Sequence, residues 1–474
     1  MAQDVGEDAP SLRNVTHGSQ PTATGRRLVG SLAELAEVGV RAVRLQYADL
    51  HGICRGKDVP ISAFPTVAEK GVGFAEAIMT VDLRHNVIAG FEVGFPDIVA
   101  RPDLDTLVPL PWEPEVVACI ADLEYEGREP CPLDSRGALK RVLARFAEHG
   151  VSPIVGPELE FYMCEPDPSD PRGWRPYAGQ DSGVYTVGDV ADPKGTLSRM
   201  LDAAVEYELG AIAAAHEYGR AQFEINLRHS GALDSADRAF RFKAMVKEMA
   251  ARDGLLATFM GKPFNDDEGS GFHLHISLLD GDGANVGFDD SGDDGSDARG
   301  LAPVMRHFIG GVLEHGPALM VFFNPTVNAY RRIHAEALVP TRVCWGHDHR
   351  MVLVRVPNER GAATRMEIRL GDGTANPYLA YAAALAAGLD GIERGLEPPD
   401  PVAGMIYELP DELLGPALPA SFQDALEALK ADPVIVSAVG EKLVDTFETI
   451  KAAELERFRA WVTDWEFAEY ANRL

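Results

Sequence analysis

The stretch GPELEFY (156–162) holds two glutamates, Glu158 and Glu160, in an otherwise apolar run. The residues around them, 152–164, are rich in β-branched and aromatic side chains and predict a buried strand. Side chains two residues apart on a strand point to the same face. Two like charges held together in a buried place are costly unless positive charge lies between them. The pair therefore raises the expectation of a bound cation.

Other strand-like segments bring more acidic and imidazole side chains into apolar surroundings. Taken singly, a Glu-x-Glu pair is more often a solvated face, and a His-x-His strand more often serves packing. The conjunction favours a metal site, because carboxylate oxygens with an imidazole suit hard divalent ions such as magnesium or manganese. Two such ions would offset the buried charge and could also hold phosphates for transfer. The further side chains are Glu217, Glu224, His273, His275 and Glu367.

Arginines are concentrated between residues 331 and 369, in a chain whose net charge is −29. Arginine grips phosphate and carboxylate groups with two parallel hydrogen bonds. A row of ion pairs on a sheet face is the alternative. Together with metal-binding carboxylates, the arginines predict nucleotide-dependent chemistry, although no Gly-rich loop ending in Lys-Ser or Lys-Thr marks a P-loop protein. The arginines considered for this role are Arg331, Arg332, Arg350, Arg355, Arg365 and Arg369.

Length and composition limit the class of protein. A chain of 474 residues predicts two or three domains. The acidic excess argues against nucleic-acid or acidic-membrane partners, and no apolar run reaches the length of about 18 residues that predicts a membrane span. Five scattered cysteines fit reduced thiols. Residues 1–27 lack a signal-peptide pattern and predict a disordered polar tail on a cytoplasmic protein.

The elements that must position these side chains fall into two regions. Residues 28–130 predict a small mixed α/β domain, and residues 131–474 a larger α+β domain. A helix capped by Asp134 or Ser135 opens the second region, and Gly150 follows its end. The Gly/Asp-rich stretch 279–300 predicts a surface loop rather than a calcium site. Strands are expected at 152–164, 220–228, 271–279, 349–357 and 363–372, and helices at 193–210, 232–254 and 376–395.

In their order along the chain, these motifs resemble the glutamine synthetase family, class I type. The matching stretches are GPELEFY, HEYGRAQFEIN, ADRAFRFKAMVKEMA, GKPFNDDEGSGFHLHISL, NPTVNAYRR and TRMEIRLGDGTANPYLA, and the resemblance covers residues 28–474. It implies an α+β fold with a β-grasp-like N-terminal domain and a catalytic domain built on a curved antiparallel sheet with helices. It also implies a homo-oligomer of hexameric rings, usually a dodecamer, with active sites between neighbouring subunits.

The resemblance assigns roles to the candidate residues. One metal ion, Mg²⁺ or Mn²⁺, would be held by Glu160, Glu217 and Glu224, and a second by Glu158, His273 and Glu367. ATP, the co-substrate, would contact Lys262, His275, Ser277, Arg355 and Arg365. L-Glutamate would be held by Gly269, Arg332 and Arg369, beside Glu268. The arginines expected to act in catalysis are Arg332, Arg350 and Arg355, the last two by neutralising the transferred phosphoryl group.

The implied reaction has two steps: ATP phosphorylates the γ-carboxylate of glutamate, and an amine then displaces phosphate. In the family, an Asp of the N-terminal domain and a Glu six residues after the substrate-binding arginine receive ammonium. Here the matching positions are Ala75, in FAEAI (74–78), and Leu338, while Ile78 replaces a serine. Loss of two carboxylates and gain of alkyl surface favour a bulkier, less polar amine. The sequence thus predicts a γ-glutamyl-amine ligase acting on a polyamine, ethanolamine, an alkylamine or an arylamine.

Alternatives remain at this stage. Glu76, Glu268 or Glu336 could anchor a second amino or hydroxyl group of the amine. If Glu76 or Glu336 replaced the missing base, the protein would be an ammonia-dependent glutamine synthetase. A catalytically silent structural or regulatory relative is the third possibility. Tyr407 matches a tyrosine that some family members carry as an adenylylation site, or is an ordinary packed tyrosine.

Overall fold

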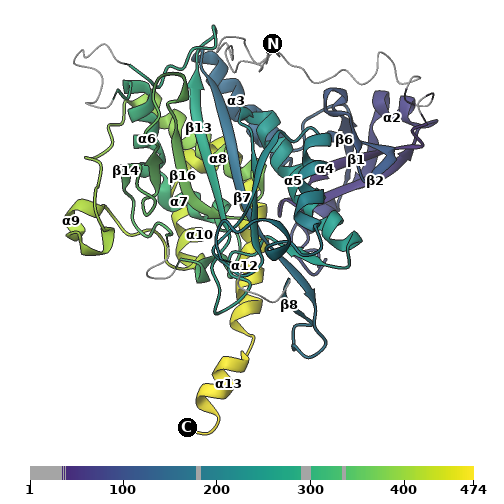
Figure 1. Cartoon of the computed structure of the whole chain (residues 1–474). Coiled ribbons are helices and arrows are strands. Elements are labelled where there is room, and N and C mark those ends of the chain that lie inside the picture. The colour runs from purple at the N-terminus through teal and green to yellow at the C-terminus, as the bar shows by residue number, and fades with distance from the viewer. Residues whose placement is uncertain (1–34, 36, 38, 178–182, 290–299, 334–337) are drawn as a thin grey trace, which may run out of the picture.

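The computed structural model describes residues 35, 37, 39–177, 183–289, 300–333 and 338–474. The predicted disordered tail 1–27, Glu336, and part of the Gly/Asp-rich stretch (290–299) lie outside these residues. In the described part, the strands form two main sheets that fall on either side of residue 130 in the sequence. Figure 1 shows the smaller sheet, in purple, beside the larger one, with α5 between them.

The smaller sheet has the strand order β2-β1-β6-β4-β3, with β5 also paired to β6. Its central strands β1 and β6 are parallel, and the other pairs are antiparallel. A parallel central pair with antiparallel neighbours is consistent with the predicted β-grasp-like domain. The elements are β1 (Ala42–Ala48), β2 (Cys54–Pro60), α2 (Phe64–Lys70), β3 (Val72–Ala75), β4 (Asp97–Pro102), β5 (Val108–Leu110) and β6 (Glu113–Glu124).

The larger sheet has the order β14-β15-β16-β13-β7-β10-β9, and β8, β11 and β12 also pair with β7. All its pairs are antiparallel except β14 with β15. The predicted α+β class with a mainly antiparallel sheet is confirmed. The strands are β7 (Ser152–Pro166), β8 (Trp174–Pro176), β9 (Ala211–His216), β10 (Gln222–Leu227), β11 (Ser230–Gly231), β12 (Leu256–Thr258), β13 (Gly271–Leu279), β14 (Trp345–His347), β15 (Val354–Val356) and β16 (Met366–Asp372).

One predicted strand is shorter than expected. Residues 349–353, which were expected to extend a strand to 357, form a turn, and β15 covers only Val354–Val356. The His349 ring accepts a hydrogen bond from the Met351 backbone N–H (3.2 Å). This local side-chain bond to the backbone competes with strand pairing.

Helices cover the larger sheet and supply most of the core. Helix α8 is buried on all sides along 377–391, as expected for a helix that is apolar all round. It crosses α6 so closely that a Cβ on Gly311 would lie only 2.1 Å from the Ala387 carbonyl oxygen. The helices are α3 (Ser135–Glu148), α4 (Thr196–Glu206), α5 (Ala232–Arg252), α6 (Pro303–Glu314), α7 (Gly316–Phe323), α8 (Pro377–Arg394), α9 (Asp411–Leu414), α10 (Phe422–Lys430), α11 (Pro433–Val439), α12 (Glu441–Arg459) and α13 (Asp464–Tyr470).

Asp134 is the N-cap of α3, as predicted, and accepts a hydrogen bond from the Arg136 backbone N–H. Within the described ranges, no helix is both long enough and apolar enough to cross a membrane.

A buried arginine joins the two domains. Arg136, on α3, binds both carboxylate oxygens of Asp237 on α5 (2.9 and 2.8 Å). The same guanidinium reaches Asp122 on β6 (2.7 Å) and Asp103, which follows β4 (2.8 Å). Only 3% of the Arg136 residue is exposed. A guanidinium fork shared among three carboxylates fixes the smaller sheet against the larger domain.

Replacing this arginine should destabilise the protein strongly. Arg136→Met leaves the Asp237 carboxylate buried without its partner, which typically costs about 3–5 kcal/mol. We expect a clear fall in the urea unfolding midpoint. Arg145→Met, on the same helix, removes an exposed pair with Glu393 and should cost about 0–1 kcal/mol. Equal midpoints for the two variants would contradict this role of Arg136.

Candidate active site

The predicted metal-binding side chains lie on one face of the larger sheet because of its register. Glu158 and Glu160 are two apart on β7 and share a face. His273 on β13 lies directly opposite Glu158, and Glu224 on β10 lies directly opposite Glu160. Glu367 on β16 is opposite His275. Side chains on directly opposed residues stand about 4.5–5.5 Å apart at Cβ, so four strands bring these groups together.

The first group is formed by β7, β13 and β16. One carboxylate oxygen of Glu158 lies 2.9 Å from His275 Nε2 and the other lies 3.4 Å from His273 Nδ1. His273 Nδ1 is also 3.7 Å from Glu367. Ligand atoms of Glu158, His275 and Glu367 all lie within 4.8 Å of one another, close enough for one metal ion. Both histidines of the His-x-His pair thus reach Glu158, whereas the resemblance gave only His273 as a ligand.

The second group is acidic. Glu160 accepts hydrogen bonds from Gln222 Nε2 and the Gly271 backbone N–H, both at 2.7 Å. Glu217 follows β9 and Glu224 lies on β10, where Asn226 donates to its carboxylate. Burial and the charge of Glu160 raise the pKa of Glu217 to about 7. Burial and the charges of Glu158 and Glu160 raise the pKa of Glu224 to about 9.

These shifts test whether a metal fits. Both pKa values are raised by burial and by repulsion between neighbouring carboxylates, a repulsion that Arg350 offsets only in part, so a bound cation would stabilise the group. All its donors are carboxylate oxygens, the ligands that magnesium and manganese prefer. The first group offers imidazole nitrogens in addition to carboxylate oxygens. The residues therefore fit divalent ions at both groups.

Arginines lie at the Glu367 end of the face. Glu367 is fully buried and accepts hydrogen bonds from Arg355 (2.7 Å) and from Arg369. Burial disfavours its charge, yet the charges of His273 and Arg369 lower the pKa of Glu367 to about 2. Arg350 offers its backbone carbonyl to Arg369 (2.9 Å), and its charge acts on Glu217. Three of the five arginines from 350 to 369 thus adjoin the carboxylates.

Arg332 reaches the same place from another segment. A Cβ on Gly271 would lie 2.9 Å from a Glu160 oxygen, 2.9 Å from His273 Nε2 and 3.1 Å from Arg332 Nη2. Only glycine leaves room for the three side chains to converge there. One guanidinium nitrogen of Arg332, Nη1, is buried with no hydrogen-bond partner among the described residues. An unsatisfied buried donor of this kind favours an anionic ligand.

The remaining predicted nucleotide-binding residues lie farther along the sheet. Arg365 Nε contacts His275 Nδ1 at 3.3 Å, and Ser277 Oγ donates to the Thr364 carbonyl at 3.0 Å. Lys262 donates to the backbone carbonyl of Asp267, in the loop that also carries the exposed Glu268 and the predicted substrate-binding Gly269. The Gly269 carbonyl accepts from Gln222 at 3.1 Å.

Three of the predicted amine-pocket residues, Ala75, Glu76 and Ile78, lie in the N-terminal domain and not on the sheet that carries the carboxylates. Ala75 is exposed at the end of β3, and Ile78 is half-buried in the short helix that follows. Glu76 is buried inside the N-terminal domain, where its carboxylate accepts a 2.5 Å hydrogen bond from Tyr125. Leu338 is exposed, and Glu336 is outside the described residues. In Figure 1 the N-terminal sheet lies across α5 from β13 and β16.

Three residues that sequence reasoning missed belong to the site. Gln222 links Glu160 to the Gly269 carbonyl, and its place two residues before Glu224 on β10 was a usable signal. Asp348 binds Arg355 (2.6 Å) from a turn with no periodic pattern. Tyr185 is exposed, and the charge of Glu217 raises its pKa. Nothing in the sequence around Tyr185 indicated that this residue lies near Glu217. Tyr407, by contrast, is partly exposed in a short helix at 406–408.

Comparisons with known proteins agree with this geometry. The family described as glutamine synthetase, catalytic domain, matches residues 132–470. Glutamine synthetase of Methanococcus voltae is 36% identical over 91% of this chain and 96% of its own length. Glutamine synthetase of Thermotoga maritima is 34% identical over 92% of this chain and 97% of its own. The solved structure of apo GmaS is 34% identical with a TM-score of 0.82, covering 93% of this chain and 99% of the other, and a GmaS–ADP complex gives 0.81.

Metal binding can be tested through stability. We expect magnesium or manganese to raise the thermal unfolding midpoint of the protein, since a ligand at a hundred times its Kd adds about 2.7 kcal/mol. Glu224→Gln removes one candidate ligand and a buried carboxyl whose charged form is disfavoured without metal. Its metal response should therefore shrink, while the metal-free variant should be at least as stable as the wild type.

Glu165→Gln is the matched control, because Glu165 lies on the same strand β7 but pairs with Arg175 and Lys194. It should keep the full metal response. A metal response that is equal in Glu224→Gln and in the wild type would exclude Glu224 as a ligand.

Proposed function

The chain belongs to the glutamine synthetase family, and we propose that it joins the γ-carboxyl of L-glutamate to a small organic amine at the expense of ATP. The coarser part of this statement, an ATP-dependent ligase of the family, follows from the family itself. The acceptor amine is the proposal.

The described side chains support separate binding roles on the sheet face for glutamate, the transferred phosphoryl group and the nucleotide. Arg332 and Arg369, both buried, are suited to hold the carboxylates of glutamate. Arg355 and Arg350, which adjoin Glu367 and Glu217, would neutralise the phosphoryl group in transfer. His275, Ser277, Arg365 and Lys262 would line the nucleotide. The GmaS structure that resembles this chain has been solved with ADP. Bound magnesium or manganese would offset phosphate charge and orient the phosphates.

The proposed reaction forms and breaks one bond in each step. A γ-carboxylate oxygen of glutamate attacks the terminal phosphorus of ATP, and ADP leaves with the electron pair of the broken P–O bond. The amine nitrogen then attacks the γ-carbonyl carbon of the acyl phosphate. Inorganic phosphate leaves, and the nitrogen loses a proton to give the amide. Arg332 and Arg369 would keep glutamate fixed through both steps, which is the positioning that such a reaction needs.

The observation that carries the choice of acceptor is Ala75. It stands exposed at the end of β3, where the family resemblance places the carboxylate that receives ammonium. A methyl group there offers no charge to a small cation but offers apolar contact to an alkyl chain. Glu76 cannot substitute for that carboxylate from its present place, because it is buried against Tyr125. The exposed ring of Tyr185 near Glu217 adds an aromatic surface that favours an alkylammonium group.

The placement of the N-terminal sheet supports an assembly. Since that sheet lies across α5 from β13 and β16 (Figure 1), Ala75 would meet a site from a second copy of the chain. We therefore include in the proposal the ring-shaped homo-oligomer, of dodecamer type, that the resemblance implies. Ammonia remains the second candidate acceptor, because the curated relatives at 34–36% identity are named glutamine synthetase.

An amine panel tests the acceptor. Phosphate release from ATP with glutamate and magnesium should be fast with at least one organic amine and slow with ammonium, and mass spectrometry should identify the amide. Turnover chiefly with ammonium would make the protein a glutamine synthetase. No metal-dependent ATP turnover with any amine would indicate a catalytically silent relative.

Restoring the missing carboxylate should shift the preference. We expect Ala75→Asp to raise kcat/KM for ammonium relative to the organic amine by about 10- to 100-fold, since a hydrogen bond to a charged group contributes about 1.5–3 kcal/mol. Ala63→Asp, an identical change at an exposed residue before α2, should leave the ratio unchanged. The same ratio in both variants would remove Ala75 from the acceptor site.

A further inference from the structure

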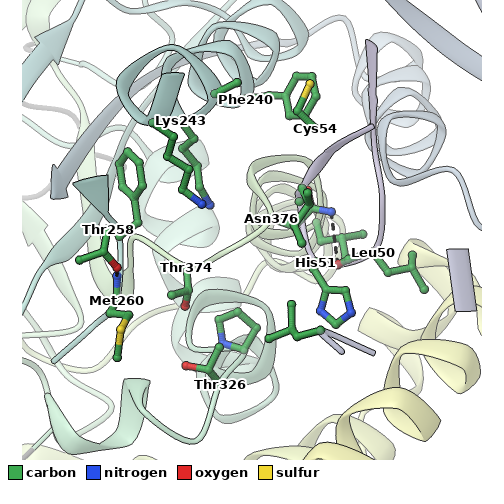
Figure 2. Close-up of a pocket in the computed structure, with 18 of the residues that line it drawn as sticks. Leu50, His51, Cys54, Phe240, Lys243, Thr258, Met260, Thr326, Thr374 and Asn376 are labelled. Carbon is green, nitrogen blue, oxygen red and sulfur yellow. Dashed lines mark hydrogen bonds between the residues drawn. The ribbon is translucent and has the colours of Figure 1, made fainter. Parts of the chain in front are cut away.

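A second cavity lies between the N-terminal domain and the catalytic domain, apart from the carboxylate cluster. It encloses about 590 Å³, a volume within the range of about 300–1,000 Å³ typical of small-molecule sites. Its walls come from the loop 49–53 after β1, from α5, from β12 and from the loop 373–376 after β16. Figure 2 shows His51, Thr326, Thr374 and Asn376 around it, with Lys243 reaching in from α5.

The charge of this cavity is opposite to that of the chain. Of the described residues that line it, five are basic and one, Glu248, is acidic, although the whole chain carries a net charge of −29. Some of these bases already have partners. The basic residues are Arg44, His51, Lys243, Lys247 and Lys451.

Three of these five basic side chains already have a hydrogen-bond or ion-pair partner. Arg44 binds Asp58 (2.8 Å) on β2, and Lys451 binds Glu454 (3.1 Å) on α12. His51 Nε2 donates to the Val81 carbonyl at 3.0 Å. The cavity therefore depends for its free charge on the two lysines of α5.

Lys243 and Lys247 stand one turn apart on the same helix and face the same space. Lys243 is buried and donates to the Ala375 carbonyl at 2.6 Å, but it has no ion pair with a described carboxylate. Lys247 makes no hydrogen bond or ion pair to another residue that the structure describes, and its ammonium lies 6.0 Å from the Phe259 ring. Burial and the charge of Lys247 lower the pKa of Lys243 to about 7. Two neighbouring lysines, neither ion-paired to a carboxylate that the structure describes, favour a bound anion.

Neutral groups of the cavity complete a binding surface. The Thr258 hydroxyl accepts from the Met260 backbone N–H (3.2 Å) and the Thr326 hydroxyl from the Ala329 N–H (3.1 Å). Each hydroxyl can still donate its own hydrogen into the cavity. Phe240, Phe259 and Leu379 supply apolar wall. The surface suits a molecule with one anionic end and a short apolar body.

We propose that this interdomain cavity binds a small carboxylate- or phosphate-bearing metabolite, held by Lys243 and Lys247, and that its binding regulates the active site. The inference concerns a site distinct from the proposed ligase centre and does not depend on which amine that centre uses.

The loop after β16 connects the interdomain cavity to the active site. Lys243 holds the Ala375 carbonyl, and Asn376 donates to the Asp49 carbonyl (3.0 Å) of the N-terminal domain. Thr374 is bound to Asp372, the last residue of β16, the strand that also carries Glu367 and Arg369. Asp372 is buried, and its charge acts on both Lys243 and Arg332. An anion that neutralises Lys243 would therefore change the field at Arg332, which we expect to grip glutamate.

Calorimetry tests the site directly. Succinate and orthophosphate are titrated separately into the full-length enzyme with magnesium, ADP and glutamate at saturation, so that the catalytic site is filled. We expect at least one anion to bind, with a Kd at least tenfold weaker in Lys247→Gln and in Lys243→Met. The same anion should change KM for glutamate in the wild type and leave it unchanged in Lys247→Gln.

Lys442→Gln is the matched control, because Lys442 is an exposed lysine of α12 that pairs with Glu92 and does not line the cavity. It should bind as the wild type does. Binding of succinate alone would identify a carboxylate ligand, and binding of orthophosphate alone a phosphate ligand. If Lys243→Met does not fold, the anion affinity of Lys247→Gln compared with the wild type tests the proposal alone. No binding of either anion, or equal affinity in Lys247→Gln and the wild type, would overturn the site. Because the calorimetric titration needs no turnover, the test of anion binding is separate from the test of the ligase reaction.

Discussion

Repulsion among carboxylates on one face of the larger sheet is the constraint around which the site is arranged. Glu158, Glu160, Glu217 and Glu224 meet where β7, β9 and β10 lie side by side. Burial and repulsion from neighbouring carboxylates raise the pKa of Glu217 to about 7 and that of Glu224 to about 9. At the other end of the same face, Arg355 and Arg369 neutralise Glu367. The negative end thus favours divalent ions, and the positive end favours phosphate and carboxylate groups. That polarity is what a ligase using ATP and glutamate requires.

Holding such a face together requires a rigid support behind it. Helix α5 packs on β7, and the buried helix α8 packs on α3, α5 and α6. Glycines permit the closest approaches: Gly311 lets α6 cross α8, and Gly271 leaves space for Glu160, His273 and Arg332. Arg136 then fixes the smaller sheet to this support through three carboxylates. A buried charge network is costly to break, so the orientation of the two domains within one chain is well determined.

The two halves of the proposed chemistry are carried by different structural units. Phosphoryl transfer would depend on the large sheet, whereas Ala75, the residue proposed to select the acceptor, lies at the end of β3 in the N-terminal domain. The acceptor can therefore change without disturbing the carboxylates. The interdomain cavity lies between the two units, and the loop after β16 connects it to the catalytic strand. A ligand in that cavity would contact both units at once.

The sequence alone determined much of this. Alternation along β7 and β13 placed the Glu-x-Glu and His-x-His pairs on single faces, and the caps and periodicity predicted α3, α5 and α8. These are local properties, set by the strand period of two residues and the helix period of 3.6.

Which residues face one another across strands was decided only by the tertiary structure. The register paired Glu158 with both histidines, brought Gln222 to Glu160, and placed Arg332 beside Gly271 from a distant segment. Turns such as the one carrying Asp348 follow no period. The lysine-lined cavity needs three segments far apart in the chain, and no local pattern encodes their meeting, because pairing and docking are set by burial over the whole fold.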